Sequence, residues 1–299
     1  MFEYKTLRRL RVWLLVALLS AVTVWHHAGI AETDGELRLG VFPRHPAQDM
    51  QRMFEPLRRY LSETLGTAVS LHTPVDYPSF WAAVEAGDYD LLHYNQYHYV
   101  RGHAAFGHRL VAANEEHGRQ QIAARIYVRT DSKAQQLEDL RGRKILFGGG
   151  PDAMVSYVLG TDLLRKRGLN EGDYIARFAQ NPVKALIGLH YMQADAAAAG
   201  APVIDLPTIR QQLGDGSLRV LAQGDPIPHL PWATAATVDE DRRQAIETAL
   251  LELNSALGGR AILDAMQLTG LRRASDRQYD SVREVIQRVH GEDYTQPRR

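Results

Sequence analysis

The sequence predicts an α/β protein with two lobes, in which a ligand cleft separates two mixed, mostly parallel sheets flanked by helices. Strand-like apolar runs alternate with amphipathic helical runs from residue 36 onward, which is typical of parallel sheets with covering helices. This alternation restarts at Ile122, and the chain returns through a Pro-rich stretch at residues 225–231. We therefore expect lobe one to comprise residues 33–120 and 225–299, and lobe two residues 121–224.

Lobe one begins with a strand followed by a long amphipathic helix. Residues 36–42 alternate and are rich in Leu and Val, which indicates a strand that ends at Pro43. The apolar spacing predicts a helix over residues 49–65, and Gly66 stands where a glycine commonly ends a helix. Further strands are expected over residues 68–72, 89–92 and 110–113, and further helices over residues 77–86, 96–103, 239–256, 258–266 and 276–290.

Lobe two repeats the same kind of alternation. A short buried strand over residues 144–147 leads into Gly148-Gly149-Gly150-Pro151 and then a helix over residues 153–167. Further strands are expected over residues 122–128, 194–198 and 218–221, and a further helix over residues 181–190. Ligands in open α/β sheets bind beyond the carboxyl ends of strands. The loops to examine are therefore residues 43–49, 73–78, 93–97, 148–154 and 225–232.

Composition and motifs exclude several classes of function. The 35 basic and 35 acidic residues cancel, so no global field favours nucleic acid. The absence of cysteine excludes disulfides, thiolate metal sites and Cys nucleophiles. No Ser/His/Asp set or paired-acid motif is visible, and Gly148–Gly150 lacks the Lys-Ser/Thr ending of a nucleotide P-loop. We expect a monomeric protein that is not an enzyme and requires no cofactor.

The N-terminus has the layout of a secretory signal peptide. Basic residues precede an apolar run from Val12 to Trp25, and Gly29-Ile30-Ala31 supplies the small residues of a cleavage site. The apolar run is shorter than the ~20 residues needed to span a bilayer. We therefore expect a signal peptide over residues 1–31 and a periplasmic product; an uncleaved N-terminal anchor is the alternative.

Four stretches resemble the phosphonate/phosphite-type periplasmic solute-binding proteins, which are the receptors of ABC importers. The stretches are LRLGVFPRHP…FEPLRRYLSETLG (37–66), VDYPSFWAAVEAGDYDLLHYNQYHYV (75–100), LEDLRGRKILFGGGPDAMVSYVLGTDLLRKRGL (137–169) and DPIPHLPWA (225–233). The resemblance covers most of residues 36–290 and implies a type II periplasmic binding fold that closes on its ligand. It also implies an inner-membrane ABC permease as partner.

The sequence departs from this family where the anion is held. Family members that bind phosphonate usually carry a Ser-Thr-Ser run at the start of the second-lobe helix, and this chain has Ala153-Met154-Val155 there. Each charge-assisted hydrogen bond contributes roughly 1.5–3 kcal/mol. We therefore expect ordinary phosphonate and phosphite to bind weakly or not at all.

The residues expected to hold the ligand lie in two segments that face each other in this fold. The expected ligand-binding residues are Tyr77, Tyr94, Asn95, Gln96, Tyr97 and Met154, and the expected metal ligands are His93, His98, Met154 and His45. Imidazole and thioether donors without a carboxylate cage favour copper over hard cations. The sequence therefore predicts capture of a small ligand, with a transition metal such as copper as the leading candidate.

Several alternatives remain open at this stage. A small organic solute could instead bind in an apolar pocket lined by Tyr77, Tyr94, Tyr97 and Trp232, and a small oxyanion that resembles phosphate or phosphonate is a further alternative. The protein could present its ligand to a membrane sensor kinase rather than to a permease, or it could handle a metal. An enzyme on the same fold would need a nucleophile and base, which the sequence does not show.

Overall fold

The computed structural model describes residues 35–214 and 216–295. The predicted signal peptide, residues 1–31, lies outside the described residues. Among the described residues, no helix combines the length and the apolar character that a membrane crossing requires.

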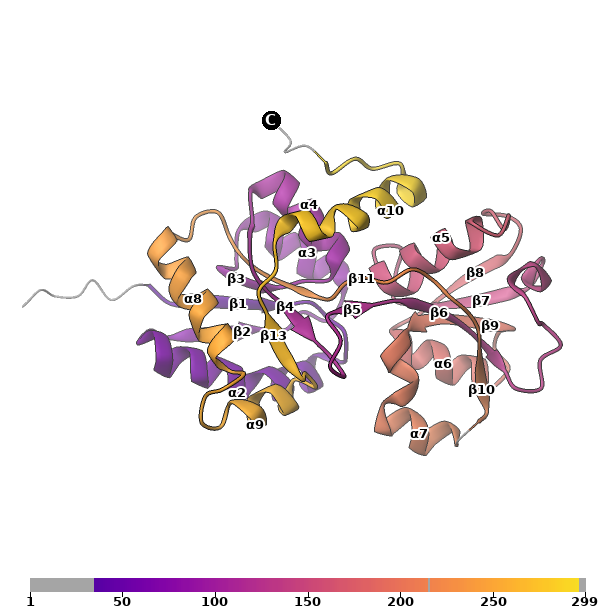
Figure 1. Cartoon of the computed structure of the whole chain (residues 1–299), viewed down its shortest axis with the longest axis horizontal. Coiled ribbons are helices and arrows are strands. Elements are labelled where there is room, and N and C mark those ends of the chain that lie inside the picture. Colours follow the sequence, from indigo (N-terminus) through magenta and orange to yellow (C-terminus); the bar gives the residue numbers. More distant parts are fainter. Residues whose placement is uncertain (1–34, 215, 296–299) are drawn as a thin grey trace, which may run out of the picture. The chain divides into compact units, whose positions relative to one another are not determined.

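The first sheet has six strands in the order β13-β4-β12-β3-β1-β2 (Figure 1). The strands are β1 (Leu37–Val41), β2 (Val69–His72), β3 (Leu91–His93), β4 (Arg109–Glu115), β12 (Pro231–Thr234) and β13 (Gly270–Arg272). β1 pairs in parallel with β2 and β3, whereas β12 pairs antiparallel with both β3 and β4. Late strands thus complete a sheet that early strands begin.

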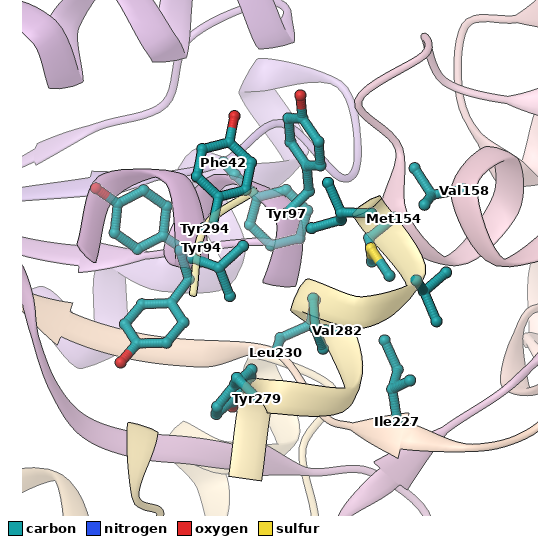
Figure 2. Packing of buried hydrophobic residues seen from close by; sticks show 14 of the residues in the cluster. Phe42, Tyr94, Tyr97, Met154, Val158, Ile227, Leu230, Tyr279, Val282 and Tyr294 are labelled. Carbon is teal, nitrogen blue, oxygen red and sulfur yellow. The ribbon is translucent and has the colours of Figure 1, made fainter. Parts of the chain in front are cut away.

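Helices cover both faces of this sheet, because each face presents buried apolar side chains. The helices are α2 (Ala47–Leu65), α3 (Tyr77–Ala86), α4 (Gln96–Phe106), α8 (Glu240–Glu252), α9 (Gly259–Ala265) and α10 (Asp280–His290). One apolar cluster joins residues of α2, α8 and α9 to the sheet, and a second joins residues of α3, α4 and α10. The second cluster also contains Met154 and Val158, which follow β7 (Figure 2).

The second sheet has five strands in the order β10-β6-β9-β7-β8. The strands are β6 (Ala124–Arg129), β7 (Lys144–Gly148), β8 (Ile175–Ala179), β9 (Ala196–Gly200) and β10 (Leu218–Gln223), and the helices beside them are α5 (Leu159–Arg165), α6 (Pro182–His190) and α7 (Pro207–Leu213). β9 is fully buried and built from Ala and Gly. These small residues let a helix approach closely, since a Cβ on Gly160 would lie 3.2 Å from the Cβ of Ala198.

Two short strands connect the segments that carry the two sheets. β5 (Gln121–Ile122) pairs antiparallel with β11 (Ile227–Pro228). The strands of the five-stranded sheet all lie between residues 124 and 223, and those of the six-stranded sheet lie outside that range. The assignment of whole lobes to residues 33–120 with 225–299 and to residues 121–224 stays a prediction.

Two helix-flanked sheets of mixed strands confirm the predicted fold class. Fewer pairings are parallel than expected, because β4, β12, β13, β6 and β10 run antiparallel to their neighbours. The strand expected over 122–128 is interrupted at Ala123, and the helix expected over 153–167 starts with a π-helical turn, η2 (Met154–Val158). β8, β12, β13 and α7 were not predicted.

Candidate functional site

A cavity of about 60 Å³ lies where the loops after β1, β3 and β7 meet. It is lined by Phe42, Arg44, Tyr77, Asn95, Gln96, Ile122, Gly148, Ala153, Met154, Val155, Ser156, Pro182, Gly200, Val203 and Leu230. Most of these side chains are apolar, and drug-sized ligands usually occupy ~300–1,000 Å³. The cavity therefore suits a small solute with an apolar body.

The loop after β7 brings backbone N–H groups to this cavity. A Cβ on Gly148 would lie 2.3 Å from the Cα of Pro182, and Gly149 has a φ of 102°, so both positions require glycine. The helix that follows starts at Met154, and the first N–H groups of a helix have no acceptor within it. The N–H groups of Met154, Val155 and Ser156 are thus available to an anion.

The hydroxyl in this turn is already engaged. The Ser156 hydroxyl donates to the carbonyl oxygen of Gly148 at 2.5 Å, and Ser156 is buried. The hydroxyl therefore braces the loop and is not an open donor.

Asn95 and Gln96 approach the cavity from the start of α4. Asn95 caps the helix by accepting from the backbone N–H of His98, and its amide donates to the carbonyl oxygen of Asp152 at 3.0 Å. Gln96 is fully buried and donates through Nε2 to the carbonyl oxygen of Pro228 at 2.9 Å. Its Oε1 atom has no hydrogen-bond partner among the described residues, so the site contains an unused acceptor.

Arg44 is the charged side chain among the described residues that line the cavity. Its Nη1 and Nη2 donate to Glu116 Oε1 and Oε2 at 2.5 and 3.0 Å. Glu116 is 4% exposed, and its Oε2 lies 3.6 Å from Nε2 of the buried His229. Burial works to raise the pKa of Glu116, but the charges of Arg44 and His229 outweigh it and hold the pKa at about 2. The Arg44–Glu116 pair is therefore ionised.

The sequence did not single out this buried pair. Arg44 and His229 lie in the loops 43–49 and 225–232, which the sequence marks for attention, but Glu116 lies in none of the marked loops. The Arg44–Glu116 pair joins positions 72 residues apart, so it depends on the tertiary fold.

Four of the predicted ligand-binding residues line the cavity, namely Tyr77, Asn95, Gln96 and Met154. Tyr94 and Tyr97 belong to the buried apolar cluster that Figure 2 shows, and they are not part of the cavity lining. The hydroxyl of Tyr94 lies 2.6 Å from His108 Nδ1, and that of Tyr97 donates to Glu292 at 2.6 Å. The binding roles of all six residues stay predictions.

Two of the predicted metal ligands, His93 and His98, are packed against aromatic rings. The His93 ring stacks on Trp232 at 4.4 Å between ring centroids, and the His98 ring stacks on Tyr77 and Trp81, each at 5.4 Å. Phe42 lies between these stacks, since its ring contacts both His93 and Tyr77. Burial lowers the pKa of His93 to about 3 and also lowers that of His98, although Asp152 partly opposes the second shift.

In the part of the chain that the structure describes, no group of three or more His, Cys, Asp or Glu residues is arranged to hold a metal ion. His45 is half-buried in the loop that carries Arg44, and Met154 belongs to an apolar cluster. The copper hypothesis therefore finds no support in this arrangement of side chains.

A larger, open groove of about 1160 Å³ contains five arginines but fits a binding site less well. Most of these arginines already have partners: Arg272 with Glu115, Arg273 with Glu247, Arg210 with Asp205, and Arg125 with Gln223. None of the sequence-predicted site residues lines it. We therefore take the smaller cavity as the candidate site.

Comparison with known proteins agrees with this architecture. A family model described as "ABC transporter, phosphonate, periplasmic substrate-binding protein" matches residues 39–279. The PhnD1 protein of Prochlorococcus marinus, solved with methylphosphonate, is 15% identical, with a TM-score of 0.75 over 86% of this chain and 99% of that one. A binding protein component of an ABC phosphonate transporter from Pseudomonas aeruginosa is 14% identical, with a TM-score of 0.75 over 86% and 87%.

A third similar structure is the XAC2383 protein of Xanthomonas citri bound to ATP. It is 16% identical, with a TM-score of 0.74 over 86% of this chain and 99% of that one. At these identities the solved structures establish the fold, and the family match confirms the resemblance seen in the sequence.

Proposed function

Because the chain belongs to the phosphonate-type periplasmic substrate-binding family of ABC transporters, we propose that it captures a small solute with an apolar body and an oxyanion head. Members of this family are periplasmic, bind a small ligand, work with an ABC permease and are not enzymes.

The observation that carries the proposal is the combination of donors and apolar surface in one small cavity. The N–H groups at the start of η2 lie beside Ile122, Met154 and Leu230, which offer the body of a solute an apolar wall. A helix N-terminus favours negative charge through both its free donors and its dipole. An anion with a short apolar substituent satisfies both parts of the lining.

Doubly charged phosphonate fits this cavity less well than it fits the Ser-Thr-Ser run that phosphonate-binding family members usually carry. Ala153, Met154 and Val155 supply no hydroxyl, and the hydroxyl of Ser156 is bonded to Gly148. We therefore expect weak binding of the methylphosphonate dianion. Delivery to a sensor kinase instead of a permease stays an alternative prediction.

The test starts with native mass spectrometry and metal analysis of protein freshly exported from cells. Calorimetry then measures binding of methylphosphonate, methanesulfonate and copper(II). We expect at least one oxyanion to bind. Retention of stoichiometric copper together with no oxyanion binding would contradict the proposal and revive the metal hypothesis.

A charge placed in the cavity supplies a matched pair of variants. Val155→Asp puts a carboxylate beside the N–H groups of η2 and is expected to weaken oxyanion binding by about tenfold or more. Val220→Asp makes the same change on β10 at a position that is 42% exposed and outside the cavity, so binding should be retained. Equal affinity in both variants would show that the anion binds elsewhere.

A further inference from the structure

The electrostatic balance of the cavity depends on a residue that does not line it. Arg44 faces the cavity, and Glu116 holds its two terminal nitrogens in a fork at 2.5 and 3.0 Å. A carboxylate that is 4% exposed cannot turn to solvent, so its charge stays opposite the guanidinium. The cavity therefore carries almost no net charge from its side chains.

The fork leaves part of the guanidinium free. Arg44 has more N–H donors than the two that Glu116 uses, so it can still donate to a ligand while it remains paired. An anion that binds here gains a directed hydrogen bond but little net attraction. A second negative charge on the ligand would meet the field of Glu116 without a further cation to balance it.

The unused acceptor of Gln96 points to a second requirement. Its Nε2 atom is bonded to the carbonyl oxygen of Pro228, while Oε1 is buried without a partner. A buried acceptor without a donor is unfavourable, so a ligand that brings an O–H group is favoured here. An oxyanion that keeps one proton supplies such a group, and a fully ionised one does not.

We propose that the site selects a singly charged oxyanion that retains one O–H group, such as the hydrogen form of an alkylphosphonate, and rejects the dianion. Glu116 and Gln96 are then specificity-determining residues. This inference rests on the proposed function, because it specifies the protonation state of the oxyanion head that the cavity holds.

The ionisable groups near the Arg44–Glu116 pair do not interfere with a measurement of ligand affinity against pH. The titratable or charged groups that face Arg44 and Glu116 are His45, Tyr77, His93 and His229. Burial lowers the pKa of His45 and His229 to about 4 and that of His93 to about 3, and it raises the pKa of Tyr77 to about 12. These side chains keep their charge between about pH 6 and about pH 8.5, so a change in affinity there reports the ionisation of the ligand.

Calorimetry on the wild-type protein provides the first test, with methylphosphonate and methanesulfonate as probes. Raising the pH from about 6 to about 8.5 removes the remaining proton from most of the methylphosphonate but leaves methanesulfonate singly charged. We expect methylphosphonate affinity to fall about fivefold or more while methanesulfonate affinity stays constant. At about pH 6, the hydrogen form should also bind more tightly than methanesulfonate, which has no O–H.

Two variants test separately the two features that set selectivity, namely the charge of Glu116 beside Arg44 and the open acceptor of Gln96. Glu116→Gln leaves the charge of Arg44 uncompensated and is expected to raise affinity for the methylphosphonate dianion about tenfold or more. Gln96→Leu removes the open acceptor and should abolish the preference for hydrogen methylphosphonate over methanesulfonate. Glu115→Gln is the control, because Glu115 pairs with Arg272 and does not line the cavity.

The outcomes distinguish this inference from the proposed function. If both probes bind but methylphosphonate binds more tightly at the higher pH, the selectivity inference is overturned and the oxyanion proposal stands. If neither probe binds at either pH, both are overturned. The wild-type profile decides the matter even if Glu116→Gln does not fold.

Discussion

The imidazole of His93 is packed among the rings of Phe42, Phe54 and Trp232. The side chain is buried, and neither ring nitrogen has a hydrogen-bond partner of good geometry, although the amide of Asn114 lies nearby. Burial lowers its pKa from 6.5 to about 3, so the folded protein holds this ring neutral. Below pH 6.5 the His93 imidazole becomes protonated in the unfolded chain but stays neutral in the folded chain. The free energy of unfolding therefore falls as the pH drops.

We expect His93→Phe to relieve this loss. The free energy of unfolding of the variant relative to wild type should rise by about 1 kcal/mol or more between pH 8 and pH 5.5, since each pKa unit corresponds to about 1.4 kcal/mol. Urea denaturation at both pH values measures the difference. His72→Phe is the control, because His72 is an exposed residue of β2. The same pH-dependent gain in both variants would refute the explanation.

The residues of the candidate site were only partly predictable from the sequence. Tyr77, Asn95, Gln96 and Met154 follow strand ends or begin helices, and chain order alone places such positions near the cavity. Glu116 contacts Arg44 only because β4 and β1 belong to one sheet. Histidines that looked like metal ligands instead stack within aromatic clusters, and residue type alone cannot distinguish those environments.

At the scale of elements, the loop between β7 and η2 sets the position of the N–H groups. Gly148 lies against the backbone of Pro182, and backbone cannot move aside as a flexible side chain can. Gly150, two residues later, has open space where a Cβ would be placed. The two glycines therefore have different structural roles within one run.

This contrast predicts different outcomes for two identical substitutions. Gly148→Ala should lower the free energy of unfolding by about 1–3 kcal/mol and weaken ligand binding, because the loop must shift away from α6. Gly150→Ala should change stability by less than about 0.5 kcal/mol. Thermal denaturation and calorimetry on both variants check this. A stable, fully active Gly148→Ala variant would mean that the contact with Pro182 is not restrictive.

Element boundaries were predictable where local chemistry determines them. α3 spans Tyr77–Ala86 as expected, with Asp76 as its N-cap and Gly87 in the left-handed conformation after it. β12 was missed because Pro231 and its neighbouring prolines indicate a loop, whereas proline is tolerated at the first residue of a strand. β8 was missed because its side chains are mostly exposed and give no clear alternation.

For the whole molecule, several buried histidines each lower the free energy of unfolding as the pH falls. Burial lowers the pKa of His108 and His229 to about 4, and that of His93 to about 3. Each therefore contributes stability above pH 6.5 that is lost progressively toward its folded pKa. The pKa of Glu116 is also lowered, from its ordinary value of 4.5 to about 2, so its contribution to stability is lost as the pH falls between these two values.

We expect the free energy of unfolding to fall by several kcal/mol, on the order of 1.4 per pH unit for each group, as the pH drops from about 6.5 to about 4. Chemical denaturation across this range, at constant ionic strength, measures the slope. The triple variant His93→Phe, His108→Gln, His229→Gln should flatten the profile. A wild-type profile that is already flat from pH 7 to pH 4 would contradict the assignment of these rings as buried and neutral.

The place of β12 between β3 and β4 also determines when the first sheet can be completed. A chain that emerges amino end first presents β3 and β4 well before residues 231–234, and the whole five-stranded sheet is encoded in between. Until then, β3 lacks one neighbour and β4 lacks both, and pairing over such long sequence separations is intrinsically slow. A nascent chain thus remains without a finished first sheet through most of its synthesis. A chain that stops short of residue 231 instead retains one open edge on β3 and two on β4, the kind of surface on which aggregation begins.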